Sequence, residues 1–297
     1  MSFTAEVKTE LTSIESEQDC CKRAYAYGFL LFGKSFSARS VYCCSDYEYV
    51  INSFKNAVED ETGVTADISC TESGKYTLQL PSVKKSREVF EYFGHGIRDI
   101  SLRINYANFS DECCYGAFLR GVFLACGSIS NPDTNYHLEF VIPYYKLSQD
   151  LLKFLQDRNL NAKYILRKYA HVIYLKDSES IEDLLTLMGA TQSSLMIMGI
   201  KIQKNVRNNI NRQINCESAN LSRTIDAGFA QIDAINIIEK KQGLDSLPDE
   251  LKELALLRRA NPDWSLKTLG ANLSEPISRS GVNHRFQRIL SIAEKYK

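Results

Sequence analysis

A duplicated segment in the first two-thirds of the chain constrains its fold more than any other feature. Residues 20–37 and residues 113–130 align without a gap at an offset of 93 residues, and seven of the eighteen positions are identical. Ordinary composition would give roughly one identity by chance. The identical pairs are Cys20/Cys113, Cys21/Cys114, Ala24/Ala117, Gly28/Gly121, Leu31/Leu124, Ser35/Ser128 and Ser37/Ser130. A repeat this long indicates two similar half-domains rather than a solenoid.

The same order of elements is predicted after each copy, from β-branched and aromatic alternation for strands and 3.6-residue apolar spacing for helices. After the first copy we expect a strand over 38–44, a helix over 46–61, strands over 64–70 and 75–80, and a helix over 83–94. After the second we expect a strand over 136–142, a helix over 146–159, strands over 162–167 and 171–175, and a helix over 179–188. The fold class is therefore α+β, with pseudo-twofold halves over 1–110 and 111–200.

Each copy itself predicts a helix with glycine on one face. Gly28 and Gly121 carry no Cβ, so two such helices can bring their backbones close together. The alternative is a pair of core helices that contain glycine by coincidence. We prefer close packing, because the whole order of elements repeats and not only the glycine.

The segment Leu119-Arg120-Gly121-Val122-Phe123-Leu124-Ala125-Cys126-Gly127 resembles the LAGLIDADG motif of homing endonucleases. In that family the motif helices pack at the domain interface, and an acidic residue near each helix end binds the catalytic Mg²⁺. Alignment on glycine puts these acids at Gly33 and Cys126, which offer no carboxylate oxygen to a hard cation. Asp111 and Glu112 precede the helix, and Asp133 follows a proline. The resemblance thus implies a scaffold without catalytic residues, so the chain is not expected to be an enzyme.

Longer stretches resemble the WhiA family of bacterial sporulation and cell-division regulators. They are LRGVFLACGSISNP (119–132), YHLEF (136–140), NCESANLSRTIDA (215–227) and SGVNHR (280–285). The resemblance spans nearly the whole chain and is strongest after Cys113. It implies a degenerate LAGLIDADG-like domain followed by an all-α helix-turn-helix domain.

Nine cysteines are present, and six of them form the adjacent pairs Cys20/Cys21, Cys43/Cys44 and Cys113/Cys114. Adjacent cysteines do not suit disulfide geometry with each other. Because there is no CxxC pair and the four histidines are scattered, we favour buried reduced thiols over a zinc site. We expect no metal and no cofactor. No apolar run is long enough for a membrane span and no signal peptide opens the chain, which predicts a cytoplasmic, nucleoid-associated protein without a membrane partner.

Charge is distributed unevenly along the chain. Residues 1–199 carry 20 Lys/Arg and 25 Asp/Glu, whereas residues 200–297 carry 16 Lys/Arg and 11 Asp/Glu. The excess of positive charge predicts that the C-terminal part binds an anionic partner. Residues 201–245 are expected to form a basic helical linker that ends at Gly243. Lys204, Arg207 and Arg212 are its predicted secondary DNA contacts. A solvated helical connector without DNA contacts is an equally weighted alternative.

The last segment, 246–297, predicts three helices, with a helix-turn-helix motif over about 265–296. The first helix begins near Pro248 and stops at Asn261-Pro262. Ser265 caps a short helix over 265–273, and Ser278 caps a third helix over 279–296. A short helix, a turn and a longer helix are what docking in the major groove requires.

The third helix carries apolar residues on one arc: Val282, Phe286, Ile289, Leu290 and Ala293. The other arc supplies the predicted base contacts Ser280, His284, Gln287 and Arg288, flanked by Asn283, with Arg288 able to hold guanine through two hydrogen bonds. Lys267, Thr268, Ser278, Arg279 and Arg285 are the remaining predicted DNA contacts, mainly to phosphates. The alternative is a helical bundle with an ordinary polar face.

These features predict a sequence-specific transcription regulator of sporulation or cell division, without nuclease activity. Its partner would be double-stranded promoter DNA, with RNA polymerase or a co-regulator as a second partner. Two alternatives remain. One is a metal-dependent DNA endonuclease, and the other is a protein-interaction scaffold in cell division or chromosome segregation.

Overall fold

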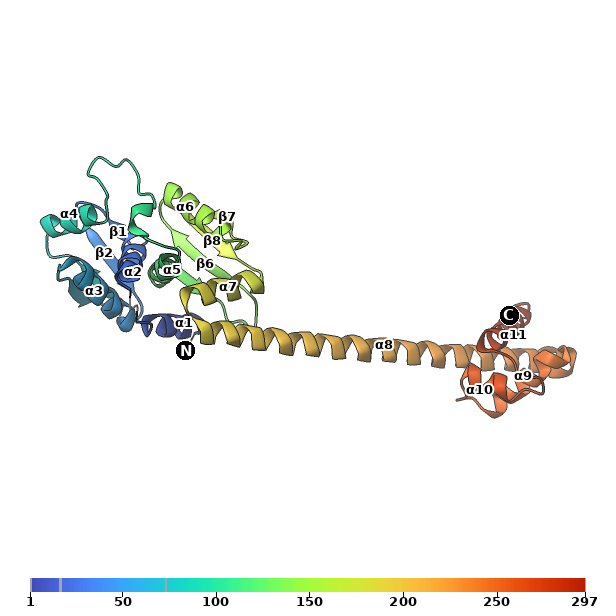
Figure 1. Ribbon diagram of the computed structural model, residues 1–297. Coiled ribbons are helices and arrows are strands. Elements are labelled where there is room, and N and C mark those ends of the chain that lie inside the picture. Colours follow the sequence, from blue (N-terminus) through green and yellow to red (C-terminus); the bar gives the residue numbers. More distant parts are fainter. Residues whose placement is uncertain (1, 16–17, 73, 297) are drawn as a thin grey trace. The chain divides into compact units, whose positions relative to one another are not determined.

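The computed structural model describes residues 2–15, 18–72 and 74–296 of the 297-residue chain. The chain divides into two compact units, Met1–Lys204 and Asn205–Lys297. Helix α8 (Thr191–Gln242) contributes residues to both units (Figure 1). Within the described part of the chain, none of the helices combines the length and the apolar character that a membrane crossing requires.

Unit 1 contains both copies of the duplication, and each copy folds with the same order of elements. The first copy forms α2 (Asp19–Leu31), β1 (Ser35–Phe36), β2 (Val41–Ser45), α3 (Glu48–Thr62), β3 (Asp67–Cys70), β4 (Tyr76–Gln79) and α4 (Val83–Tyr92). The second forms α5 (Cys113–Cys126), β5 (Gly127–Ile129), β6 (Leu138–Ile142), α6 (Tyr145–Gln156), β7 (Lys163–Arg167), β8 (Ala170–Leu175) and α7 (Ser178–Met188). Helix α1 (Phe3–Thr12) precedes both copies, and a 3-10 helix (Tyr106–Asn108) lies between them.

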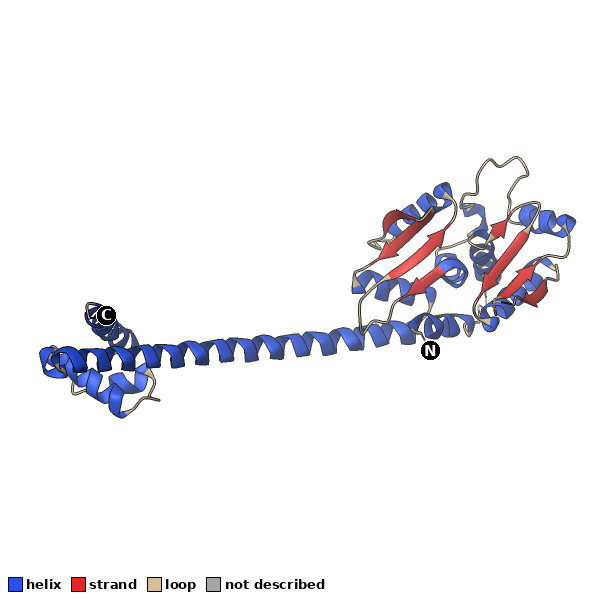
Figure 2. Cartoon of the chain, turned by 180° about the vertical axis from the view of Figure 1, so that it is seen from behind, coloured by secondary structure: helices blue, strands red, loops and turns tan. Residues whose placement is uncertain are grey.

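Each copy builds a four-stranded antiparallel sheet, and the two sheets share one strand order (Figure 2). The orders are β1-β2-β4-β3 and β5-β6-β8-β7. Cys43 pairs with Leu78 in the first sheet and Phe140 pairs with Ile173 in the second, and all four side chains are buried. Alternate residues of each strand therefore face the core. The expected α+β fold with pseudo-twofold halves is confirmed.

Helices α2 and α5 pack against each other through their glycines (Figure 1). A Cβ on Gly28 would lie 2.3 Å from the carbonyl oxygen of Phe118, and a Cβ on Gly121 would lie 2.3 Å from that of Tyr25. Carbon atoms of side chains do not approach backbone oxygens so closely, so only glycine fits at both positions. The close packing predicted for this helix pair is confirmed.

Helix α1 was not predicted, and it closes one side of the core of unit 1. The Ser2 hydroxyl caps it by accepting a hydrogen bond from the backbone N–H of Ala5. Phe3, Val7 and Leu11 recur every fourth residue, so their side chains lie on one face and are buried. Strands β1 and β5 were missed as well, because two or three residues are too few to show alternation.

Helix α8 begins where a carboxylate satisfies its first backbone N–H groups. Gln192 and Ser193 donate these groups to Glu10 over 2.7 and 3.0 Å, and an anion at this end also suits the helix dipole. The helix ends at Gly243, whose φ of 78° favours glycine. This is the stop expected from the sequence. The linker predicted over 201–245 lies within α8 and the short helix after it, and the predicted domain limits remain a proposal.

Unit 2 packs the end of α8 against a short 3-10 helix and three α-helices. These are the 3-10 helix Leu244–Ser246, α9 (Asp249–Ala260), α10 (Leu266–Ala271) and α11 (Arg279–Glu294). Their core contains the buried side chains of Ile235, Leu251, Leu254, Leu269, Phe286 and Ile289. The three helices expected after residue 246 are confirmed, with ends that differ by a few residues.

Candidate nucleic-acid interface

Two serine caps fix where α10 and α11 begin. The Ser265 hydroxyl accepts a hydrogen bond from the backbone N–H of Thr268 at 3.1 Å, and that of Ser278 accepts one from Gly281 at 3.3 Å. Between the helices, Ile277 donates its N–H to the carbonyl of Gly270. A Cβ on Gly270 would lie 2.4 Å from the Ile277 oxygen, so glycine lets the turn pack directly on α10.

Helix α11 has one buried face and one exposed face. Val282, Phe286, Ile289 and Ala293 are buried as predicted, whereas Leu290 is only partly buried. Most of the predicted contacts on this helix and at its cap are exposed: Ser278, Arg279, Ser280, Asn283, His284, Gln287 and Arg288. Arg285 is partly buried. The helix therefore presents a polar surface while its apolar face is held in the core of unit 2.

Two arginines of α11 are paired with a carboxylate, which the prediction did not foresee. Arg288 lies 2.5 Å from one oxygen of Glu250 on α9, and Arg285 lies 3.3 Å from the other. The prediction that Arg288 contacts a base stays a prediction, and in the free protein this side chain is held by Glu250. Because the pair is about half exposed, its contribution to stability is about 0–1 kcal/mol, and a phosphate or a base edge could replace Glu250.

Lys267 and Thr268 lie at the exposed start of α10. The Thr268 hydroxyl is 2.8 Å from the Ser265 hydroxyl, so these two side chains and the first backbone N–H groups of the helix gather at one end. Helix starts of this kind suit phosphate groups. The arrangement is compatible with the predicted phosphate contacts of Lys267 and Thr268.

Arg258, which the sequence analysis did not single out, holds the framework beneath α11. It is buried and donates hydrogen bonds to the side chain of Gln231 on α8 and to the carbonyls of Pro262 and Trp264. Its guanidinium also lies over the ring of Phe286, 5.4 Å from the centroid. Burial lowers the pKa of Arg258. One side chain thus connects α8, the loop after α9 and the core face of α11.

The three predicted secondary DNA contacts on α8 differ in whether their side chains have a partner within the protein. Lys204 has partners within the protein, since its ammonium donates to the Pro132 carbonyl at 2.6 Å and lies 4.8 Å from the centre of the Tyr136 ring. Arg207 and Arg212 are exposed. All three secondary contacts stay predictions, and Lys204 would have to leave the Pro132 carbonyl to bind a phosphate.

The two positions aligned with the LAGLIDADG acids lie at a cavity of about 460 Å³ in unit 1. Gly33 has no room for a side chain, because a Cβ there would lie 2.4 Å from the sulfur of Cys43. Burial raises the pKa of Cys126 to about 12, an effect that the nearby Lys8 partly offsets, so the thiol is protonated at neutral pH. Neither position offers the carboxylate oxygen that Mg²⁺ requires.

Lysines dominate the same cavity. Among its described lining residues are Lys8, Lys34, Lys75 and Lys168, with Asp46 as the one carboxylate. The Lys8 side chain is buried and donates a hydrogen bond to the carbonyl of Leu124 at 3.1 Å. Burial lowers the pKa of Lys8 to about 8. A positive lining opposes cation binding and favours an anion.

The paired cysteines are less buried than predicted. Cys43 and Cys114 are buried, whereas Cys20, Cys21 and Cys44 are partly exposed and Cys113 is exposed. The expectation that all six act as small core residues is therefore wrong. The reason is their location, because Cys20, Cys21 and Cys113 lie in the first turns of helices that start at the surface.

The fold and this interface define a class of protein that joins a LAGLIDADG-like domain to a helix-turn-helix domain. The family described as "WhiA LAGLIDADG-like domain" matches residues 115–207, and the one described as "WhiA C-terminal HTH domain" matches residues 210–293. The chain belongs to the WhiA family.

Two relatives and one solved structure are similar to this chain, over two-thirds or more of its length. A "Probable cell division protein WhiA" of Alkaliphilus metalliredigens (strain QYMF) is 34% identical over 99% of this chain and 98% of the relative. A protein with the same description from Clostridium tetani is 47% identical over 67% of this chain and 64% of its own length. The crystal structure of full-length DUF199/WhiA from Thermatoga maritima is 26% identical with a TM-score of 0.62, covering 100% of this chain and 99% of that one.

Proposed function

We propose that this chain is a sequence-specific DNA-binding transcription regulator of sporulation or cell division that does not cut DNA. The observation that carries the proposal is helix α11, whose buried face is fixed in unit 2 while Ser280, Asn283, His284 and Gln287 remain exposed. Hydroxyl, amide and imidazole groups can read base edges in the major groove. Membership of a family whose relatives are described as cell division proteins supports the cellular role.

In this proposal Lys267, Thr268, Ser278 and Arg279 bind phosphates on either side of the recognition helix. Arg285 and Arg288 reach DNA by exchanging Glu250 for a phosphate or a guanine edge. This exchange costs little free energy, because the ion pair is exposed and DNA has a higher density of negative charge than one carboxylate. Arg207 and Arg212 on α8 would add contacts without sequence preference.

The absence of nuclease activity rests on the cavity of unit 1. Cleavage of a phosphodiester by metal ions needs ligands that hold them beside the attacking and leaving oxygens. Gly33, Cys126 and the buried ammonium of Lys8 offer none. We expect supercoiled plasmid to stay intact when it is incubated with the pure protein and Mg²⁺ or Mn²⁺. A nicking activity that requires the metal ion and co-elutes with the protein during purification would contradict this part of the proposal.

The cellular test is chromatin immunoprecipitation with sequencing of the tagged full-length protein. We expect discrete peaks at promoters that share a motif, and loss of these peaks in a His284→Ala/Gln287→Ala variant produced at the same level. Binding to a duplex that carries the motif should weaken steeply with added salt, because phosphate contacts release condensed cations. Uniform coverage of the chromosome, unchanged in the variant, would argue against sequence-specific regulation.

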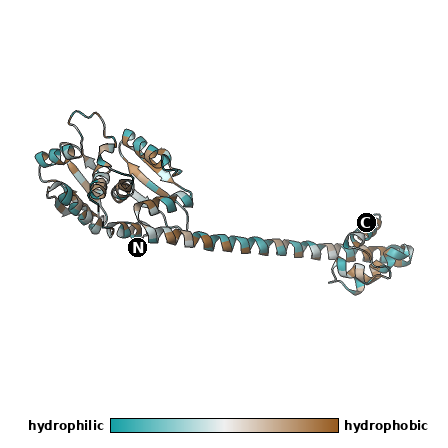
Figure 3. Cartoon of the chain, viewed as in Figure 1, coloured by the Kyte–Doolittle hydropathy of each residue, from teal (hydrophilic) through white to brown (hydrophobic). Residues whose placement is uncertain are grey.

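A protein-interaction role is the second candidate function, and the surface of α8 favours it. Apolar residues recur along α8 (Figure 3). Beyond Lys204, six of these side chains are between 47% and 64% exposed: Val206, Ile210, Ile214, Leu221, Ile225 and Phe229. Exposed apolar residues that recur along a helix are typical of partner-binding surfaces. RNA polymerase or a co-regulator is the partner expected for a transcription regulator. Replacing Ile210 and Ile214 by serine should then abolish regulation while leaving the DNA affinity unchanged.

A further inference from the structure

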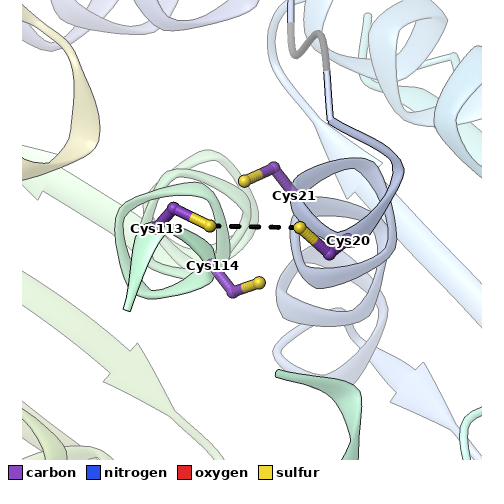
Figure 4. Close-up of side chains that lie close together, drawn as sticks. All are labelled: Cys20, Cys21, Cys113 and Cys114. Carbon is purple, nitrogen blue, oxygen red and sulfur yellow. Dashed lines mark hydrogen bonds between the residues drawn. The ribbon is translucent and has the colours of Figure 1, made fainter. Parts of the chain in front are cut away.

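Four cysteines converge where helices α2 and α5 begin. The sulfurs of Cys20, Cys21, Cys113 and Cys114 all lie within 4.8 Å of one another, and the Cys20 and Cys113 sulfurs are 3.9 Å apart. Figure 4 shows the four side chains pointing into the space between the two helices. Each copy of the duplication supplies two of the sulfurs, so the cluster exists only because the two copies pack together.

We propose that these four cysteines bind one zinc ion as a tetrathiolate site. A zinc–sulfur bond of about 2.3 Å places the sulfurs of a tetrahedral site about 3.8 Å apart. The widest sulfur separation in the cluster exceeds that by only about 1 Å, a change that rotation of the cysteine side chains supplies. Thiolate sulfurs are soft ligands and select zinc over magnesium or calcium.

The surroundings suit the negative charge of a zinc tetrathiolate. The cysteines occupy the first turns of α2 and α5, where backbone N–H groups and both helix dipoles favour anions. The Gln18 side-chain oxygen accepts hydrogen bonds from the thiols of Cys113, Cys20 and Cys21 over 3.2, 3.7 and 3.8 Å. This amide therefore contacts three of the four sulfurs, and its N–H groups can donate to them once the thiols lose their protons.

Proton release should accompany zinc binding. Zinc binds thiolates rather than thiols, so coordination must displace protons from the four cysteines. The affinity for zinc should therefore fall as the pH is lowered.

The site would join the two halves of unit 1 at one end of the α2–α5 pair. The cavity with Gly33 and Cys126 lies at the other end of the same two helices. Zinc would therefore act as a structural link rather than as a catalytic ion, since all four coordination positions are filled by protein. A disulfide between Cys20 and Cys113 is the competing chemistry. It would need an oxidant and would leave Cys21 and Cys114 without a role.

Metal analysis of the full-length protein tests the proposal. The protein is purified with a phosphine reductant and zinc in the growth medium, and bound metals are measured by mass spectrometry. We expect about one zinc per chain, and loss of at least nine-tenths of it in Cys20→Ser/Cys113→Ser. The control Cys70→Ser/Cys216→Ser removes two exposed cysteines outside the cluster and should keep the zinc.

Two further measurements on the unmodified protein cover the case in which the cluster variant does not fold. Co²⁺ in place of zinc should give the intense visible bands of a tetrahedral thiolate complex. Removing zinc with a chelator should lower the melting temperature of the protein by at least about 5 °C, and adding zinc should restore it. Less than one-tenth zinc per chain, zinc retained in the cluster variant, iron in its place, or a Cys20–Cys113 disulfide in the reduced preparation would each overturn the proposal.

Discussion

The guanidinium of Arg288 lies 2.5 Å from the carboxylate of Glu250, so α9 holds helix α11 by a residue that we also expect to contact DNA. Arg285 shares the same carboxylate at 3.3 Å. Glu250 thus restrains two positive charges in the free protein. The affinity for DNA should therefore depend on the free energy needed to break these two ion pairs.

Glu250→Gln should raise the affinity for DNA of any sequence by roughly 2- to 10-fold at low salt, because one negative charge leaves the interface and two arginines are released. The free energy of unfolding should fall by less than about 1 kcal/mol. Fluorescence anisotropy over a range of salt concentrations measures the first effect. Glu239→Gln, which breaks the ion pair with Arg259 instead, serves as the matched control. A weaker complex, or the same gain in both variants, would show that Glu250 does not restrain the arginines.

Gly121→Ala should destabilise unit 1 by at least about 1–3 kcal/mol, because the added Cβ would lie 2.3 Å from the Tyr25 oxygen and 2.7 Å from the Phe29 nitrogen. Chemical denaturation provides the measurement. Gly199→Ala on α8 is the control, since no atom lies within 4 Å of its Cβ, and it should stabilise by up to about 1 kcal/mol. Equal effects at both positions would mean that α2 and α5 do not pack through their backbones.

The stability of the protein should depend on pH through Lys8. The sign of this dependence follows because burial lowers the pKa of Lys8 from its ordinary value of 10.5 to about 8. Below pH 8 both the folded and the unfolded chain carry the charge, and burial of the ammonium costs stability in full. Between pH 8 and 10.5 the unfolded chain binds more protons, so stability should rise by about 1.4 kcal/mol per pH unit.

Lys8→Met removes this contribution. The difference in unfolding free energy between Lys8→Met and the unmodified protein should therefore shrink as the pH rises from 7.5 to 9.5, as measured by urea denaturation. Lys146→Met replaces an exposed lysine and should show no such trend. A Lys8→Met difference that stays constant with pH would indicate that the ammonium is hydrated rather than buried.

Local patterns made much of the fold predictable. The duplication gave the order of strands and helices twice, and the capping serines Ser265 and Ser278 marked the starts of α10 and α11 because their hydrogen bonds reach only three residues along the chain. Helix α1 and strands β1 and β5 were missed. The strands are too short for periodicity to be visible.

Contacts between distant residues could not be predicted in the same way. Glu250 and Arg288 are 38 residues apart, and no local pattern links them. The hydrogen bond between Lys204 and Pro132 joins residues 72 positions apart and gives a predicted phosphate contact a partner within the protein. The packing of the helices decides whether a basic side chain faces solvent, contacts DNA or pairs within the protein, and the sequence does not show this packing.

The cysteine cluster left a signal that the sequence analysis did not use. Cys20/Cys21 and Cys113/Cys114 occupy identical positions in the two copies, at the starts of helices expected to pack around a pseudo-twofold axis. Equivalent residues near such an axis meet each other. CxxC spacing within one segment cannot reveal cysteines that a duplication brings together.

The central claim is that α11 reads bases, and the ratio of dissociation constants for a promoter duplex and a scrambled duplex tests it most directly. In His284→Ala/Gln287→Ala this ratio should approach one, because each good base contact is worth about 1–3 kcal/mol of discrimination. Lys267→Ala should weaken binding to both duplexes and leave the ratio unchanged, as expected for a phosphate contact. If the double variant folds with the melting temperature of the unmodified protein and still prefers the promoter to the same extent, α11 is not the recognition helix.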